Sequence, residues 1–115
     1  ALGRELMNPT LVARETLDHA TSPVFPELPG VLPGFGSADP NLWGLGFEIR
    51  GNKNPHWTGT RLDPTTFGHF GGSGSFLWVD PTRQLVGASL SSEAFGPWAI
   101  DAWPTANTVL IERYG

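Results

Sequence analysis

A histidine followed by a run of glycines is the first feature of this sequence that suggests chemistry. The segment FGHFGGSGSFLWVDP, residues 67–81, places His69 two positions before the pair Gly71-Gly72. An imidazole titrates near pH ~6.5, so it can act as a hydrogen-bond partner or a general base at neutral pH. Glycines let the backbone approach a ligand closely, because no side chain intrudes. The segment is therefore a flexible linker, a phosphate cradle or the tight mouth of an active site.

Three common chemical motifs do not fit the spacing of this segment. A phosphate loop requires Gly-x4-Gly-Lys-Ser/Thr at the start of a helix, but here no lysine follows the glycines and a strand-like sequence does. A nucleophile elbow requires Gly-x-Ser-x-Gly, and GGSGS at residues 71–75 lacks the last glycine. His19, His56 and His69 share no zinc-ligand spacing. On spacing alone, the simplest interpretation is a glycine-rich β-turn with a structural histidine.

Composition restricts the class of protein. The chain has 115 residues, enough for one domain, and its 11 acidic and 7 basic residues give a formal net charge of −4. The charges are scattered, with no basic cluster of the kind that binds nucleic acid. No apolar run approaches the ~20 residues of a membrane span, and the absence of cysteine excludes disulfides and thiolate metal sites. Five tryptophans and seven phenylalanines favour a packed globular domain over disorder.

The elements that would position the histidine and the glycines follow from hydrophobic periodicity and from the places of proline and glycine. A helical lead-in is predicted over residues 1–21, with short helices at 2–7 and 13–20. Residues 22–41 are predicted as a loop, because their prolines and glycines exclude a helix and a central strand. Strands are predicted within residues 42–92, at 42–50, 65–70, 75–80 and 84–91, with a hairpin between the last two.

A C-terminal helix is predicted over residues 96–114, with Pro97 near its first turn. Trp98 and Trp103 are expected to pack this helix on the sheet. The second half of the helix is predicted to present an apolar stripe formed by Ala106, Val109, Leu110 and Arg113. Sequential strands followed by a packing helix indicate an α+β fold, an antiparallel sheet with a C-terminal helix packed on it.

This ordered set of elements resembles the C-terminal part of the serine β-lactamase-like hydrolases. That superfamily includes class C β-lactamases, penicillin-binding proteins, D-aminopeptidases and family VIII esterases, whose third motif, Lys-Thr-Gly or His-x-Gly, lies on a strand beside the active site. His69-Phe70-Gly71 matches this motif, Leu45-Gly46-Phe47 resembles the Gly-Leu-Gly-Trp element before it, and Asp80-Pro81 falls on the turn after it. The resemblance covers residues 42–112 and implies a partial β-lactamase/transpeptidase-like fold.

The resemblance also implies catalytic roles in an acyl-enzyme mechanism that uses no metal or organic cofactor. His69 would replace the motif lysine as the hydrogen-bond partner of the general-base tyrosine. The amide of Gly72, next to Gly71, would form one half of an oxyanion hole for the substrate carbonyl.

Substrate-binding roles follow from the same resemblance. Phe70 stands at the threonine position, which removes a hydroxyl that helps to hold the carboxylate of β-lactams, and Ser73 and Gly74 follow it in the turn. Trp43 would contribute to the pocket wall. The expected ligand is a small-molecule ester, amide or β-lactam, and the changes at positions 69 and 70 favour an esterase or a peptidase.

The family's nucleophile and base motifs are absent from this chain. Ser-x-x-Lys fails because Lys53 is the only lysine and Arg50 stands three positions before it, and Tyr-x-Asn fails because Tyr114 is followed only by Gly115. A serine hydroxyl is a poor nucleophile without an adjacent base. We therefore expect residues 1–115 to be the C-terminal portion of a longer serine hydrolase and to be inactive alone. The alternative is a non-catalytic, penicillin-binding-like binding or structural module.

A partner is expected at the edge of the predicted sheet. In the family, the last strand pairs with an N-terminal strand that this chain lacks, so residues 84–91 would present an open apolar edge. The expected partner is the missing N-terminal part of the same protein or a second copy of this chain.

Overall fold

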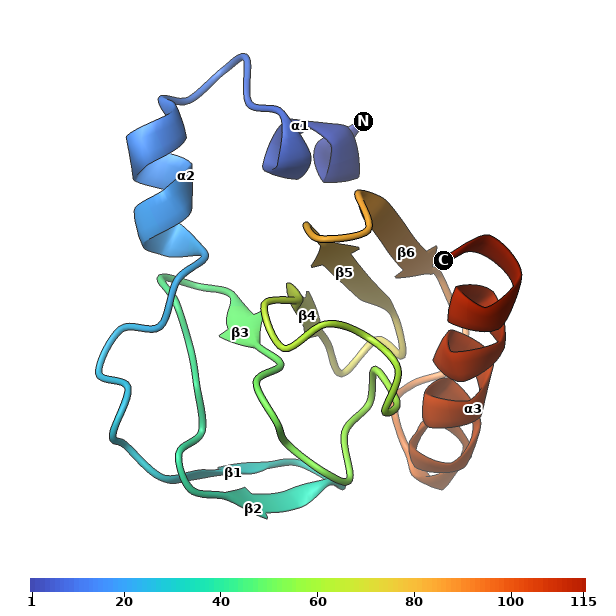
Figure 1. Ribbon diagram of the computed structural model, residues 1–115. Coiled ribbons are helices and arrows are strands. Elements are labelled where there is room, and N and C mark those ends of the chain that lie inside the picture. The colour runs from blue at the N-terminus through green and yellow to red at the C-terminus, as the bar shows by residue number, and fades with distance from the viewer.

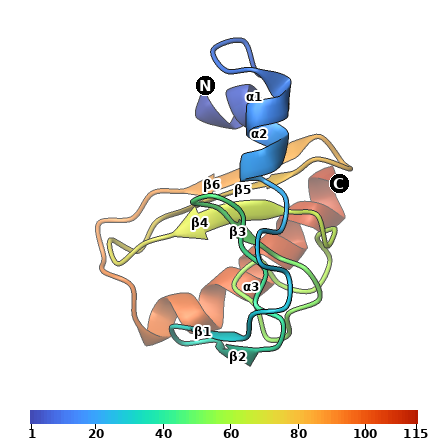
Figure 2. The same ribbon diagram turned by 90° about the vertical axis from the view of Figure 1, so that its left-hand side faces the viewer.

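In the computed structural model, which describes residues 1–115, a four-stranded antiparallel sheet forms the centre of the molecule. Its strands lie side by side in the order of the chain, β3-β4-β5-β6. The C-terminal helix covers one face of this sheet, and the two N-terminal helices lie beyond the other face (Figure 1, Figure 2). The elements are α1 (Leu2–Met7), α2 (Arg14–Ala20), β1 (Gly30–Leu32), β2 (Gly36–Ala38), β3 (Glu48–Ile49), β4 (Phe67–Phe70), β5 (Phe76–Asp80), β6 (Leu85–Ser89) and α3 (Pro97–Tyr114).

The three long strands of the sheet confirm the sequence prediction. β4 pairs with β5 in the register His69↔Leu77, and β5 pairs with β6 in the register Trp78↔Gly87. Gly87 leaves room for the indole of Trp78, because a Cβ at position 87 would lie 2.1 Å from that ring. The predicted hairpin after Asp80 is also present, and its turn is held by Arg83, which donates to the Asp80 carboxylate from the backbone N (3.0 Å) and from Nη1 (2.8 Å).

The prediction of one strand over residues 42–50 is wrong. Residues 43–48 form a tight reversal in which Trp43 bridges to Glu48, and only Glu48–Ile49 join the sheet as β3. The amide of Gly44 donates to the Phe47 carbonyl (2.7 Å), and Gly46 has a φ of +86°. Alternating apolar residues suggested an extended strand, but Gly46 between them supplies the left-handed conformation that a tight turn requires.

The loop predicted over residues 22–41 contains a small hairpin, β1 paired with β2, outside the central sheet. It lies at the end of the molecule far from α1, near the start of α3 (Figure 2). Leu32 and Phe35 of this segment are buried, so the loop contributes to the core rather than lying free in solvent.

Helix α3 is continuous through Pro104, and the apolar stripe predicted for its second half is not the face that packs on the sheet. Ala106, Val109 and Arg113 are exposed, and Leu110 is half-buried. The face against the sheet consists of Ala99, Trp103, Asn107 and Ile111, which follow one another at four-residue steps.

The buried face of α3 depends on a polar residue that periodicity does not reveal. Asn107 accepts a hydrogen bond from Trp78 Nε1 (2.9 Å) and donates one to the Trp57 carbonyl (3.0 Å). Its amide therefore satisfies buried groups of the sheet and of the 51–66 segment together.

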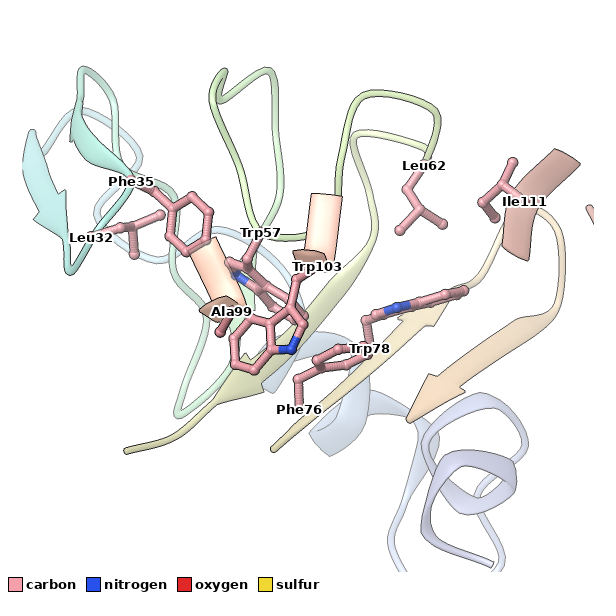
Figure 3. Packing of buried hydrophobic residues seen from close by; sticks show 9 residues of the cluster. All are labelled: Leu32, Phe35, Trp57, Leu62, Phe76, Trp78, Ala99, Trp103 and Ile111. Carbon is pink, nitrogen blue, oxygen red and sulfur yellow. The ribbon is translucent and has the colours of Figure 1, made fainter. Parts of the chain in front are cut away.

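The main core lies between the sheet and α3 and is rich in aromatic rings (Figure 3). Trp103 confirms its predicted packing role, because its ring meets Phe76 at 5.1 Å between centroids and Phe70 at 5.6 Å. Trp98 is half-buried beside it at 5.9 Å. A smaller cluster, Ile49, Phe67 and Val79, packs against α1 on the other face of the sheet. None of the helices combines the length and the apolar composition needed to cross a membrane.

Candidate functional site

Most of the site residues indicated by the sequence lie around one hollow of about 430 Å³, here called the His69 hollow. Trp43, His69, Phe70, Gly71 and Gly72 all line it. Leu32, Pro33, Glu48 and Phe95 complete its wall. The hollow therefore brings together the turn before β3, the end of β4, the glycine-rich turn after β4 and the segment before α3.

His69 is presented at the surface of this hollow by strand β4. Its side chain is exposed, and its ring meets Trp43 edge-on at 5.6 Å between centroids and 73° between planes. No hydrogen bond within the chain uses the imidazole, so both ring nitrogens are available to another group. Phe70, the next residue, points to the opposite face of the strand and packs on Phe95 at 5.0 Å.

The glycine-rich turn leaves the backbone amide of Gly72 free on the His69 hollow. The amide of Gly71 donates to the Ser75 carbonyl (3.0 Å), and the amide of Gly74 donates to the Gly71 carbonyl (3.0 Å). Phe95 N donates to the Gly72 carbonyl (3.0 Å), but no hydrogen bond within the chain uses the Gly72 amide. A Cβ at position 72 would find no atom within 4 Å. Open space and a free donor are what a ligand oxygen requires.

Ser73 and Gly74 do not line the His69 hollow. Gly74 has a φ of +82°, and a Cβ there would lie 2.0 Å from the Glu93 carbonyl oxygen. Glycine at this position therefore allows the turn to pack closely against the segment before α3. The side chain of Ser75 accepts a hydrogen bond from Ser91 N (3.1 Å), which joins the same two segments.

A buried polar cluster behind the hollow was not predicted from the sequence. Glu48, only 2% exposed, accepts hydrogen bonds from Lys53 Nζ (2.8 Å), His56 Nε2 (2.6 Å) and Trp57 Nε1 (2.7 Å). Lys53 also donates to the carbonyls of Leu42 and Ile49. Both carboxylate oxygens are thus occupied, and the sequence signal was a glutamate followed by a lysine and a histidine within eight positions.

The protonation of this cluster follows from its burial and its contacts. Burial acts to raise the pKa of Glu48, but the hydrogen bond and charge of His56 and the charge of Lys53 outweigh it and lower that pKa below its ordinary value. Burial lowers the pKa of His56, and the carboxylate of Glu48 offsets only part of this effect. Burial likewise lowers the pKa of Lys53. The cluster is therefore an anion and a cation joined by a histidine that is held neutral near pH 7.

The contacts of His56 resemble a catalytic triad, but their burial excludes that role. Thr58 N donates to Nδ1 (3.3 Å), so Nδ1 is the acceptor nitrogen, and Nε2 carries the proton that is donated to Glu48. Thr58 Oγ1 lies 2.7 Å from Nδ1, in the place of a nucleophile. However, Thr58 is 1% exposed and His56 is 2% exposed, so no substrate reaches the hydroxyl. The cluster positions Trp57 and the turn before β3.

The His69 hollow contains no nucleophile of its own. Its lining has no serine, threonine, cysteine, tyrosine or lysine side chain. No group of three histidine, cysteine, aspartate or glutamate side chains is arranged to hold a metal ion. A second hollow of about 420 Å³, between α1, α2 and the sheet, contains none of the residues that the sequence indicated as a site. The His69 hollow of this chain therefore offers a backbone hydrogen-bond donor, an imidazole and an apolar wall.

Comparison with known proteins agrees with the fold expected from the sequence. The structure is similar to the crystal structure of a β-lactamase from Mycobacterium bovis, with a TM-score of 0.94 and 47% sequence identity. The match covers 98% of this chain and 42% of that chain, so the chain spans less than half the length of that β-lactamase. Neither a family model nor a curated protein matches this chain.

This chain therefore has a partial β-lactamase fold, an α+β arrangement of an antiparallel sheet and a C-terminal helix. The similarity supports the resemblance to the β-lactamase-like superfamily that the sequence motifs indicated.

Proposed function

We propose that this chain forms the substrate-binding wall and one half of the oxyanion hole of a serine acyl hydrolase. The observation that carries the proposal is the free amide of Gly72 beside the exposed imidazole of His69, on one hollow. The 47% identity to a β-lactamase supports a hydrolase of this kind.

In the proposed reaction, a serine from outside this chain attacks the substrate carbonyl to form an acyl-enzyme, which water then hydrolyses. The Gly72 amide donates to the oxygen on which negative charge develops. One such donor contributes about 2.7–4 kcal/mol to the transition state. His69 accepts or donates a hydrogen bond to the general base and keeps it oriented. Phe70 and Trp43 exclude water from the acyl group.

The nucleophile and the base must come from another segment, because neither Ser-x-x-Lys nor Tyr-x-Asn occurs in residues 1–115. We propose that this segment is the N-terminal part of the same protein and that residues 1–115 are its C-terminal portion. The chain alone is then inactive toward esters, amides and β-lactams.

Two features of the surface support docking of a further segment. β6 is the edge strand of the sheet, so the outer backbone groups of Leu85–Ser89 have no strand partner in this chain. Beside it, β5, β6 and α3 enclose a hollow of about 540 Å³ with an apolar wall that includes Ala88, Ala106 and Val109. The proposed partner adds a strand to β6 and covers this hollow. A second copy of this chain is the other possible occupant of the edge.

The test is to co-produce this chain with the part of the M. bovis β-lactamase that the chain does not cover, and to measure hydrolysis of p-nitrophenyl butyrate and nitrocefin. The proposal expects a stable complex that hydrolyses at least one substrate and is inactivated by a serine-directed phosphonate. His69→Ala is expected to lower kcat at least tenfold without preventing assembly, whereas His19→Ala on the exposed face of α2 leaves kcat unchanged.

The second candidate function is a non-catalytic binding module, which the absence of a nucleophile from the His69 hollow favours. If the complex binds these substrates but neither hydrolyses them nor forms an acyl-enzyme, the function is that of a binding module and not of a hydrolase. A steady hydrolysis rate by residues 1–115 alone, sensitive to the phosphonate, would contradict the proposed division of the site.

A further inference from the structure

We infer that the substrate of this site is an uncharged ester with an apolar acyl chain. The acyl chain lies in a different hollow, formed by residues 24–31 and the turn at residues 43–48. This hollow, here called the Val31 hollow, has a volume of about 370 Å³. The inference rests on the proposed function, since it names the substrate class of the same site. Trp43 lines both hollows, so the two hollows adjoin at this residue.

The Val31 hollow gathers large apolar side chains that the fold leaves exposed. Phe25 is 72% exposed, Val31 70%, Leu28 58% and Leu45 52%, and all of them line this hollow. Single exposed apolar residues are common, but a group of them around one concavity marks a binding surface. The volume lies within the range of about 300–1,000 Å³ that is usual for ligand pockets.

The hollow is preformed by backbone hydrogen bonds. Val24 N donates to the Trp43 carbonyl (2.8 Å), Leu45 N to the Ala20 carbonyl (2.8 Å) and Asn41 N to the Leu28 carbonyl (2.8 Å). Phe25 has a φ of +52°, a conformation that is unfavourable for a bulky residue. Because its ring is exposed, packing within the chain does not compensate for this strain. Such strain is typical of residues that are positioned for a ligand.

The charges around both hollows favour an uncharged ligand. No lysine or arginine lines either hollow, and the Val31 hollow has no ionisable side chain in its wall. In the His69 hollow, the carboxylate of Glu48 is already paired with Lys53. The nearby Arg50 donates to the carbonyls of Gly51 and Gly59 instead. A carboxylate placed in the Val31 hollow would lose hydration without gaining a counter-charge from this chain.

The two hollows together define how an ester lies on the protein. With the ester carbonyl oxygen at the Gly72 amide, the acyl chain passes Trp43 and enters the Val31 hollow. Each additional methylene that becomes buried adds about 0.8 kcal/mol, which is about fourfold in affinity.

The experiment titrates the ¹⁵N-labelled chain with 2-hexanone, 2-nonanone and 2-undecanone, neutral ester analogues that cannot be hydrolysed. We expect 2-hexanone to shift the resonances of Gly72 and of the Trp43 indole. The longer ketones should also shift Leu28, Val31 and Leu45, with affinity rising about threefold to fourfold per methylene until the hollow is filled. Decanoate, the carboxylate of similar length, should bind at least tenfold more weakly than 2-undecanone.

The variant Leu28→Ser/Val31→Ser should bind 2-hexanone like the original chain but lose most of the gain from the longer ketones. The matched control is Val109→Ser, which removes an exposed apolar side chain on α3. It should change neither the affinity for 2-hexanone nor the gain in affinity from the longer ketones. The inference is overturned if affinity does not depend on the length of the ketone, or if the double variant gains as much affinity from the longer ketones as the original chain. It is also overturned if decanoate binds as tightly as 2-undecanone. These outcomes do not depend on hydrolysis. Failure of this inference can therefore be told apart from failure of the proposed function, which the co-production experiment tests.

Discussion

At the scale of single residues, the glycines of the turn after β4 have different roles. Gly74 is required by the fold, because its φ is positive and the Glu93 carbonyl occupies the place of a Cβ. Gly72 is not required by packing, because a Cβ there meets nothing within 4 Å. The structure thus separates a glycine needed for folding from a glycine whose absent side chain leaves room for a ligand.

This difference predicts opposite effects of the same substitution. Gly72→Ala should retain the stability of the chain or increase it by about 0.4–1 kcal/mol, because alanine has fewer unfolded conformations. It should weaken binding of 2-hexanone, because the new methyl group stands beside the amide donor. Gly74→Ala should lower the free energy of unfolding by more than about 1 kcal/mol, because it combines strain with a backbone clash.

Urea unfolding followed by tryptophan fluorescence measures the stability of both variants, and the ketone titration measures binding. The prediction fails if Gly72→Ala is as unstable as Gly74→Ala, or if it binds 2-hexanone as tightly as the original chain.

At the scale of elements, the Glu48 cluster connects β3 to the 51–66 segment and makes the fold sensitive to acid. The pKa values of Glu48 and His56 are both lower in the folded chain than their ordinary values. As the pH falls, the unfolded chain therefore takes up protons that the folded chain does not. Stability must decrease in the same direction.

We predict that the free energy of unfolding is highest above about pH 6.5, the ordinary pKa of histidine, and decreases as the pH falls below it. His56→Gln should remove the part of this decrease that begins near pH 6.5 and also reduce the part due to Glu48 near pH ~4.3, because the contact with His56 helps to lower the pKa of Glu48. The control His19→Gln, on exposed α2, should retain both. Urea midpoints at pH 8, 6, 5 and 4 measure the effect, and midpoints that stay constant from pH 8 to pH 5 would contradict it.

The elements also show how far the sequence predicts this structure. Strands β4, β5 and β6 were predictable because alternating apolar residues and turn residues are local signals. The 42–50 segment was not, because the apolar alternation of a strand continued through glycines that form a turn. On the buried face of α3 only Trp103 was predicted, and the rest was missed because Asn107 occupies a core position.

The candidate site divides in the same way between local and distant information. His69, Phe70, Gly71 and Gly72 are contiguous, so their common place on one hollow follows from a local motif. The pairing of Glu48 with His56 and Lys53 depends on how the 51–66 segment folds back on β3. The exposure of Phe25 and Val31 depends on the β1-β2 hairpin. The spacing of Glu48, Lys53 and His56 is a local signal, but no local pattern shows how the segment folds back or which apolar side chains stay exposed.

At the scale of the whole molecule, the apolar surface is unevenly covered. The 24–31 loop and Leu45 expose apolar residues on one side, where we place a ligand. On another side, the edge strand β6 borders the apolar flank of α3, with Val109 53% exposed and Leu90 92% exposed. An unpaired strand beside an apolar groove can pair with another chain through both backbone hydrogen bonds and buried area.

We therefore predict that the chain alone self-associates at micromolar concentration through the β6 edge. Ala88→Lys places a charge on the exposed edge strand β6 and should shift the sample toward monomer. Thr105→Lys adds the same charge to an exposed position of α3 outside the groove and should not. Light scattering across a dilution series measures the mass. A sample that stays strictly monomeric, or a dimer that Ala88→Lys leaves intact, would show that this edge does not bind a second copy. Adding the co-produced partner segment should displace the self-association, because both need the same strand edge.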